Sequence, residues 1–219
     1  MTAEANFLAF DLGAESGRAV LGAFDGERLR LSEVHRFPNG PVRILDSLHW
    51  DVLRLFQEMK HGLAKAAPHD LAGIGVDTWG VDWALLDAQG GLVAMPYHYH
   101  DRRTEGMMAR VFEKVPRHEV FERTGIQFME INTLFQLYAL SLQRPRLLAA
   151  ADTLLMMPDL LNYWLSGQKV CEFTDATTSQ MYDPRAGDWA RPLLEKLGLP
   201  TRILAPVVQP GTVLGPLLP

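Results

Sequence analysis

The stretch AFDLGAESGRAVL, from Ala9 to Leu21, constrains the fold more than any other part of the chain. It predicts a short apolar strand that ends in Asp11, a tight polar turn with glycines, and a second apolar strand. Glycine permits a close approach of backbone to an anion, and successive amides in such a turn form an anion-binding concavity. The stretch is not a P-loop, because G-x-x-x-x-G-K-[ST] is absent and a strand follows. It is a candidate phosphate-binding hairpin, with a hairpin that binds nothing as the alternative.

A second stretch, from Ile74 to Asp87, predicts a strand, a polar and aromatic kink, and another strand. Together the two stretches resemble the N-terminal domain of the FGGY family of carbohydrate kinases. The motifs that carry the resemblance follow the family's order and cover nearly the whole chain: Asp11–Arg18, Val76–Asp82, His98–Thr104, Arg123–Phe128, Met157–Asp159 and Glu172–Thr178.

Hydrophobic periodicity predicts the elements around these motifs. Strands are expected over 6–12, 17–24, 28–37, 73–78 and 82–87, and an amphipathic helix over 51–66 that Asp51 caps. Further helices are expected over 102–115, 116–124, 132–142, 158–164 and 190–197, with a strand over 151–157. These patterns alone give an α/β class. The resemblance implies a ribonuclease H-like (actin-like ATPase) domain, with a mixed five-stranded sheet flanked by helices and an inserted helical lobe.

Composition excludes several kinds of partner. Among 219 residues the net charge is −5 and no Lys/Arg cluster stands out, which argues against nucleic acid or an anionic membrane. The sole cysteine, Cys171, excludes an internal disulfide framework and fits a reducing cytoplasm. The start of the chain lacks the pattern of a signal peptide, and no apolar run is long enough to span a bilayer. We therefore expect a cytoplasmic protein.

Phosphate binding is expected at the first hairpin. The resemblance implies that ATP phosphates contact the loop of Ala14, Glu15, Ser16, Gly17 and Arg18, and that Asp11 helps to place Mg²⁺. Backbone amides, a hydroxyl and a guanidinium suit phosphate, and a carboxylate suits hydrated Mg²⁺. The alternatives are a solvated cation at Arg18 and a turn carboxylate at Asp11. The carboxylate of Glu15 would repel phosphate unless it points away or joins the water shell of the metal.

Sugar binding is expected at the second stretch and the strand that follows. The resemblance gives candidate contacts at Gly80, Trp79, Asp82, Asp101 and Arg103. Sugars are held by planar hydrogen-bonding groups and by aromatic faces. The alternatives are that Trp79 and Trp83 are core residues, and that Asp101 and Arg103 form a structural ion pair. His98 and His100 invite a metal interpretation, but the sequence offers no third ligand with suitable spacing, so a surface pair or a hydrogen-bonded pair is favoured.

The family carries its catalytic aspartate and most of its adenosine pocket in a second, C-terminal domain, within a Gly/Ser-His-Asp-Thr-Ala type of motif. This motif is absent up to Pro219, so we expect no catalytic base in this chain and no kinase activity from it alone. The resemblance implies transfer of the γ-phosphoryl group of MgATP to L-rhamnulose, giving L-rhamnulose 1-phosphate. The alternatives are another ketose substrate (fuculose, xylulose or ribulose) or a non-catalytic sugar-binding module on an actin-like scaffold.

Overall fold

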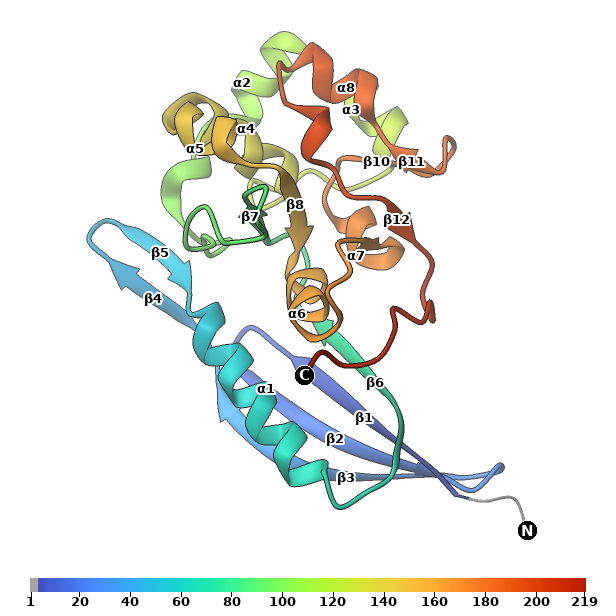
Figure 1. The fold of residues 1–219 in the computed structure, drawn as a ribbon. Helices are drawn as coiled ribbons and strands as arrows, with labels where there is room; N and C mark the ends of the chain where they lie inside the picture. Colours follow the sequence, from blue (N-terminus) through green and yellow to red (C-terminus); the bar gives the residue numbers. More distant parts are fainter. Residues whose placement is uncertain (1–3) are drawn as a thin grey trace. The chain divides into compact units, whose positions relative to one another are not determined.

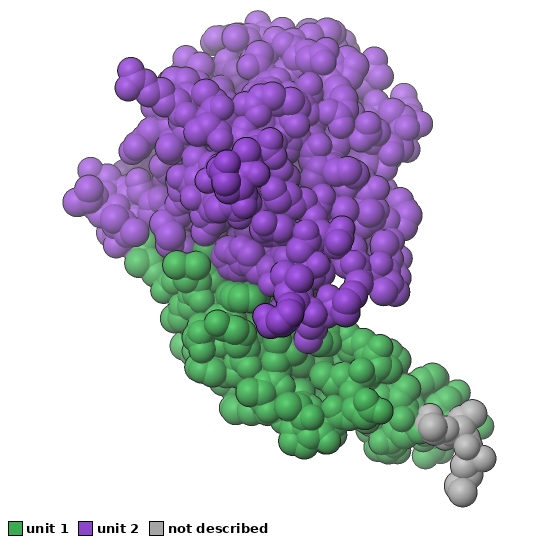
Figure 2. Space-filling view, in the orientation of Figure 1, with its two compact units in different colours: residues 1–42, 51–79 green, residues 43–50, 80–219 purple. Residues whose placement is uncertain are grey.

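The computed structural model describes residues 4–219. Two compact units make up the chain (Figure 2). Unit 1 consists of the chain up to Val42 together with Asp51–Trp79, and unit 2 consists of Arg43–Trp50 together with Gly80–Pro219. Within the described residues, no helix has both the length and the apolar character that crossing a bilayer requires.

Unit 1 is built on a mixed four-stranded sheet in the order β3-β2-β1-β6 (Figure 1). Its first three strands run antiparallel to their neighbours, and β6 lies parallel to β1 on the other side. The strands are β1 (Ala5–Leu12), β2 (Ser16–Phe24), β3 (Leu29–Pro38) and β6 (Leu71–Thr78). These bounds confirm the predicted strands over 6–12, 17–24, 28–37 and 73–78.

The helix of unit 1, α1 (Val52–Ala66), packs against β3 and β2 (Figure 1). It begins after Asp51, whose carboxylate accepts a hydrogen bond from the backbone N–H of Arg54 at 3.2 Å. Val52, Leu55 and Met59 are fully buried at helical spacing. The predicted helix and its capping residue are therefore confirmed.

Unit 2 contains short strands and most of the helices. Two buried strands, β7 (Trp83–Leu86) and β8 (Thr153–Met156), pair antiparallel. The helices are η1 (Arg102–Thr104), α2 (Met107–Lys114), α3 (Arg117–Thr124), α4 (Thr133–Gln143), α5 (Pro145–Ala150), α6 (Met157–Ser166), α7 (Phe173–Thr178), α8 (Arg191–Lys196) and η2 (Thr201–Ile203). The remaining strand pairs are β9 (Cys171–Glu172) with β12 (Val207–Val208), and β10 (Tyr182–Asp183) with β11 (Asp188–Trp189). The unit boundary falls within β4 (Pro41–Ile44), which forms a two-stranded sheet with β5 (Ser47–Trp50).

The sheet differs from the prediction in one respect. It has four strands in the described chain, where five were expected, because the strand predicted over 82–87 forms as β7 and pairs with β8. Val81 has φ 68°, a left-handed conformation that redirects the chain just before β7. All residues of β7 are buried, so this strand needs a partner from the core of unit 2. The α/β class and the helical segment after residue 100 are confirmed.

Candidate functional site

The predicted phosphate-binding hairpin forms between β1 and β2. The backbone N–H of Gly13 donates to the carbonyl of Ser16 at 2.9 Å and closes the turn. Asn39 holds the turn from outside: its side-chain amide donates to the carbonyl of Gly13, and its backbone N–H donates to the carbonyl of Glu15, both at 2.8 Å. Ala14 lies within this closed turn. The loop is thus held in place by its own sheet, as a preorganised anion site requires.

Gly17 has a packing reason to be glycine. It is buried at the start of β2, and a Cβ atom there would lie 2.4 Å from the ring of Phe37 and 2.7 Å from the side chain of Leu12. The close approach that this glycine permits is therefore between the strand and its own core. Contact between Gly17 and a phosphate stays a prediction.

Strand register places four charged residues in one row across the sheet of unit 1. Arg36, Arg18, Asp11 and Asp77 come from β3, β2, β1 and β6 in that order. Both Nε and one terminal nitrogen of Arg18 donate to Oδ2 of Asp11, at 2.8 and 2.5 Å. Both side chains are close to half exposed, so their ion pair adds little stability and leaves them open to a ligand.

Asp77 is a candidate ligand that the sequence interpretation missed. It is the penultimate residue of β6 and lies beside Asp11, to which it is paired in parallel register. Paired residues of neighbouring strands project from the same face of the sheet, which brings two carboxylates together. Both stretches show apolar residues followed by Asp in the sequence, but the parallel pairing of β1 with β6 is needed to bring the two carboxylates to one edge of the sheet.

The second predicted motif is divided between the units. Trp79 is the last residue of unit 1, where its backbone N–H donates to the carbonyl of Leu12 at 3.1 Å, and Gly80 begins the second segment of unit 2. In unit 2 the N–H of Val81 donates to the hydroxyl of Thr178 at 3.1 Å, and a Cβ on Gly80 would lie 3.1 Å from the same side chain. Two motifs of the resemblance, far apart in sequence, therefore meet at this turn.

Asp82 lies at the centre of a buried hydrogen-bond network in unit 2. Its Oδ2 accepts from the indole N–H of Trp50 at 2.5 Å and from the backbone N–H of Tyr99 at 3.1 Å. Its Oδ1 accepts from the side-chain amide of Gln136 at 2.9 Å. The side chain is fully buried, and these contacts engage both of its oxygens. Direct contact between this carboxylate and a sugar stays a prediction.

Asp101 and Arg103 extend the same network. Asp101 accepts from the backbone N–H groups of Leu48 at 2.7 Å and of Arg103 at 3.0 Å. The Arg103 guanidinium donates to Oε1 of Gln136 at 2.5 Å, lies 3.5 Å from Asp101 and stacks over the ring of Tyr97 at 4.1 Å. Burial lowers the pKa of Arg103, and the Asp101 carboxylate acts in the opposite direction. This geometry corresponds to the structural ion pair that sequence analysis left open, and sugar contact by either residue stays a prediction.

Of the two alternatives left for His98 and His100, the structure shows the hydrogen-bonded pair, and the surface alternative is wrong for His98, which is buried. The backbone N–H of His100 donates to Nδ1 of His98 at 3.0 Å. The His98 ring also packs against Trp50 and Tyr99, with ring centroids 4.1 and 4.4 Å apart. Burial lowers the pKa of His98 to about 4, so the imidazole is neutral at physiological pH.

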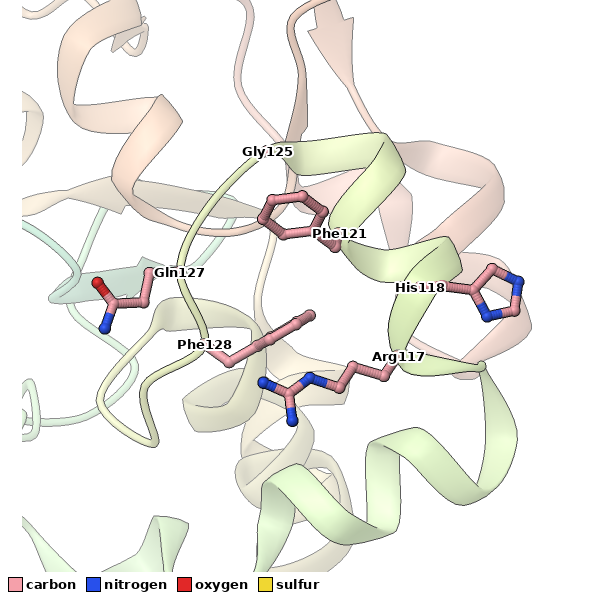
Figure 3. A pocket seen from close by; sticks show the side chains of 6 residues that line it. All are labelled: Arg117, His118, Phe121, Gly125, Gln127 and Phe128. Atoms are coloured by element: carbon pink, nitrogen blue, oxygen red, sulfur yellow. The ribbon is translucent and has the colours of Figure 1, made fainter.

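A separate hollow of about 880 Å³ opens beside α3 in unit 2 (Figure 3). Figure 3 shows Phe121 and Phe128 facing its centre, with the side chains of His118 and Gln127 turned away from them. The Arg117 guanidinium lies 4.7 Å from the centre of the Phe128 ring. None of the predicted site residues lines this hollow, so it does not form part of the candidate active site.

A family model and the curated relatives that match this chain all describe carbohydrate kinases. The model of the N-terminal domain of the FGGY family of carbohydrate kinases matches residues 6–219. Rhamnulokinase of Pectobacterium atrosepticum is 42% identical over 214 residues, which cover 96% of this chain and 43% of the relative. Rhamnulokinase of Oceanobacillus iheyensis is 39% identical, covering 97% of this chain and 46% of the relative. The chain spans less than half the length of these relatives.

Solved structures show the same fold. A carbohydrate kinase from Novosphingobium aromaticivorans has a TM-score of 0.85 and 27% identity, covering all of this chain and 45% of that chain. Xylulose kinase from Lactobacillus acidophilus has a TM-score of 0.85 at 15% identity, covering 97% of this chain and 44% of that chain. The second likeness concerns the fold alone. Together they confirm the predicted ribonuclease H-like, actin-like class.

Proposed function

Because the chain belongs to the FGGY family of carbohydrate kinases, we propose that it is the sugar-binding half of an ATP-dependent kinase for L-rhamnulose. The observation that supports this proposal most is the 39–42% identity to rhamnulokinases along almost the entire chain. The product would be L-rhamnulose 1-phosphate, and the reaction would take place in the cytoplasm, where ATP is available. The part of the relatives that this chain does not span would supply the catalytic base and the adenosine pocket.

Within this proposal the hairpin of unit 1 binds the phosphates of ATP. Backbone amides between Ala14 and Gly17 and the guanidinium of Arg18 are donors of the type that bind phosphate. Asp11 and Asp77 offer two adjacent carboxylates, a donor set that fits Mg²⁺. When bound, the ion would offset the negative charge of the phosphates.

For the sugar, we assign direct contact to the main chain at Gly80. The buried positions of Asp82, Asp101 and Arg103 favour a role in holding the strand and turn that follow, through Gln136 and Trp50. In this assignment the three charged residues are positioning residues. Trp79 stays a proposed aromatic contact, from the last position of unit 1.

The activity test uses the full-length protein and a coupled assay for ADP release, with L-rhamnulose, L-fuculose, D-xylulose and D-ribulose as acceptors. We expect kcat/KM for L-rhamnulose to exceed the others by about a hundredfold or more, as one or two unmatched hydroxyl contacts allow. A higher kcat/KM for another ketose would reassign the substrate within the family. Sugar binding without phosphate transfer to any acceptor would favour the non-catalytic module instead.

Replacing Arg18 by glutamine tests the phosphate hairpin. Loss of a charge-assisted hydrogen bond to phosphate is expected to lower kcat/KM for ATP in the full-length enzyme by about 10- to 100-fold. The free energy of unfolding should change by no more than about 0.5 kcal/mol, because the Arg18–Asp11 pair is exposed.

The matched control for Arg18→Gln is Arg30→Gln, on β3 of the same sheet. Arg30 is also an exposed arginine in an ion pair, with Glu4, but it lies opposite Ala23 instead of beside the hairpin turn. Its substitution should leave kcat/KM for ATP within about twofold, a change that corresponds to a few tenths of a kcal/mol. Equal losses in the two variants would remove Arg18 from the phosphate site.

A further inference from the structure

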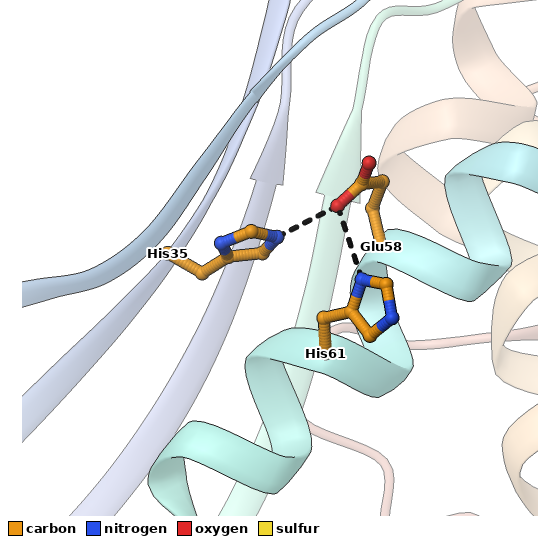
Figure 4. Close-up of side chains that lie close together, drawn as sticks. All are labelled: His35, Glu58 and His61. Carbon is orange, nitrogen blue, oxygen red and sulfur yellow. Dashed lines mark hydrogen bonds and ion pairs between the residues drawn. The ribbon is translucent and has the colours of Figure 1, made fainter.

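We propose that unit 1 carries a binding site for a first-row transition-metal dication, with Zn²⁺ as the reference ion, formed by His35, Glu58 and His61. Their ligand atoms all lie within 4.8 Å of one another. In Figure 4 one carboxylate oxygen of Glu58 lies between the two imidazole rings. The site involves none of the residues assigned to phosphate or sugar, and it does not depend on the kinase proposal.

The three side chains come together because of how α1 packs on the sheet. Glu58 and His61 are three residues apart and so share one face of α1, and His35 projects toward that face from β3 (Figure 4). Nε2 of His35 lies 2.7 Å from Oε2 of Glu58, and Nδ1 of His61 lies 3.4 Å from the same oxygen. The cluster therefore joins strand and helix through one carboxylate.

Two imidazoles and one carboxylate are a donor set that suits Zn²⁺ and leaves a coordination position open for water. Ligand atoms about 2.1 Å from a tetrahedral ion are roughly 3.4 Å from one another. The two nitrogen–oxygen separations in this cluster, 2.7 and 3.4 Å, lie near that value, and all three ligand atoms lie within 4.8 Å of one another. Mg²⁺ and Ca²⁺ prefer oxygen donors, so this set discriminates against them.

The surroundings of the cluster also fit metal ligands. Glu58 accepts from both histidines through one carboxylate oxygen, so the three side chains are already held together without a metal. The side-chain amide of Gln57 lies 3.2 Å from Nε2 of His61, the nitrogen remote from Glu58. With a metal on Nδ1, the ring proton of His61 resides on Nε2, so the Gln57 amide must turn its oxygen toward that nitrogen to accept the hydrogen bond and orient the ring.

One neighbour opposes metal binding. Nζ of Lys65 lies 2.8 Å from Nδ1 of His35, where an ammonium donates to the ring. With Nδ1 as acceptor, Nε2 carries the proton and donates to Glu58. A metal ion on Nε2 displaces that proton, the ring proton then resides on Nδ1, and Lys65 must turn away. Lys65 is exposed, so its side chain can turn into solvent, and it lowers the affinity for the metal without blocking the site.

The experiment measures Zn²⁺ affinity of the tag-free chain by competition with a chromogenic chelator, and Co²⁺ binding by visible absorption. We expect one equivalent of Zn²⁺ at micromolar affinity and Co²⁺ bands of a low-symmetry site. His61→Ala should weaken Zn²⁺ binding at least tenfold and abolish the Co²⁺ bands. The control is His69→Ala, an exposed histidine of the same unit, which should leave the affinity for Zn²⁺ unchanged.

A second variant, Lys65→Met, is expected to change the Zn²⁺ affinity in the opposite direction. Removing one positive charge several ångströms from a dication should tighten Zn²⁺ binding by about three- to tenfold. His61 and Lys65 are both exposed on α1, so circular dichroism is expected to confirm an intact fold in each variant. Equal affinity of His61→Ala and His69→Ala, or a Lys65→Met chain that binds Zn²⁺ no more tightly than the parent, would overturn the proposal.

Discussion

Replacing Asp82 by alanine is expected to lower the free energy of unfolding by about 3–5 kcal/mol, the range for breaking a buried, hydrogen-bonded charged network. The substitution removes the acceptor of the Trp50 indole N–H, the Tyr99 backbone N–H and one hydrogen bond of Gln136. A buried donor without an acceptor has given up its hydrogen bond to water and gains none in the protein, which costs about 1–3 kcal/mol for each group.

The loss should also reach Arg103, which shares Gln136 with Asp82. Burial acts to lower the pKa of this guanidinium, and the carboxylates of Asp101 and Asp82 act to raise it. Without Asp82 the buried cation keeps one nearby carboxylate in place of two. Asp82→Ala is therefore expected to lower the free energy of unfolding by more than a substitution that only leaves an apolar cavity of the same size.

Urea denaturation followed by tryptophan fluorescence and far-ultraviolet circular dichroism measures this effect. The control is Asp188→Ala, an exposed aspartate of unit 2 that lies 3.5 Å from Arg191. Its substitution should change the free energy of unfolding by no more than about 0.5 kcal/mol, as surface ion pairs do. Similar transition midpoints for the two variants would show that the Asp82 network contributes little.

Local patterns allowed much of unit 1 to be predicted. The hairpins around Gly13 and Gly26 join strands whose apolar residues alternate, and Asp51 caps a helix with regular apolar spacing. Each of these features depends on residues close together in the sequence. The same holds for the hairpin that we propose to bind phosphate, whose turn is closed by a hydrogen bond between Gly13 and Ser16.

Contacts between distant residues were beyond the reach of these patterns. Asp77 could be placed beside Asp11 only once the parallel register was known. The bond from Trp50 to Asp82 spans 32 residues, and that from His35 to Glu58 spans 23. The five-strand expectation failed for a related reason, because the pattern of β7 indicates a buried strand but does not indicate which strand will pair with it.

At pH 8, Asp159→Asn is expected to raise the free energy of unfolding by up to about 4 kcal/mol, since one pKa unit corresponds to about 1.4 kcal/mol. Asp159 lies in the first turn of α6 and is buried, and this burial raises the pKa of its carboxyl to about 7. Its Oδ1 accepts from the backbone N–H of Glu172 at 2.9 Å. Asparagine retains that acceptor and carries no charge, so it removes the cost of an ionised group in the core.

The pH dependence follows from the sign of the shift. The folded state holds the Asp159 proton up to pH about 7, whereas the unfolded chain releases it near the ordinary value of 3.8. The stabilising contribution of this group is therefore complete below 3.8 and is lost as the pH rises through 7. The advantage of Asp159→Asn over the parent should shrink toward zero as the pH approaches 4.

His98 changes the free energy of unfolding in the opposite direction over nearly the same pH range. Burial holds the pKa of its imidazole at about 4, and the nearby charges are His100 and Arg103, which lower it further, and Asp101, which raises it. The unfolded chain binds this proton near 6.5, so the contribution of His98 is present above 6.5 and is lost as the pH falls through 4. In the parent chain the two residues offset each other, and the net pH dependence that they cause between 4 and 6.5 is shallow.

Replacing Asp159 should expose the pH dependence of stability that His98 causes. The free energy of unfolding of Asp159→Asn, measured by urea denaturation from pH 4.5 to 8, is expected to rise with pH up to 6.5. Its limiting slope, about 1.4 kcal/mol per pH unit, comes from His98. Asp188→Asn, at an exposed position, should follow the parent throughout. If Asp159→Asn and the parent gave parallel curves, the carboxyl of Asp159 would titrate alike in the folded and unfolded chains, and its burial would carry no electrostatic cost.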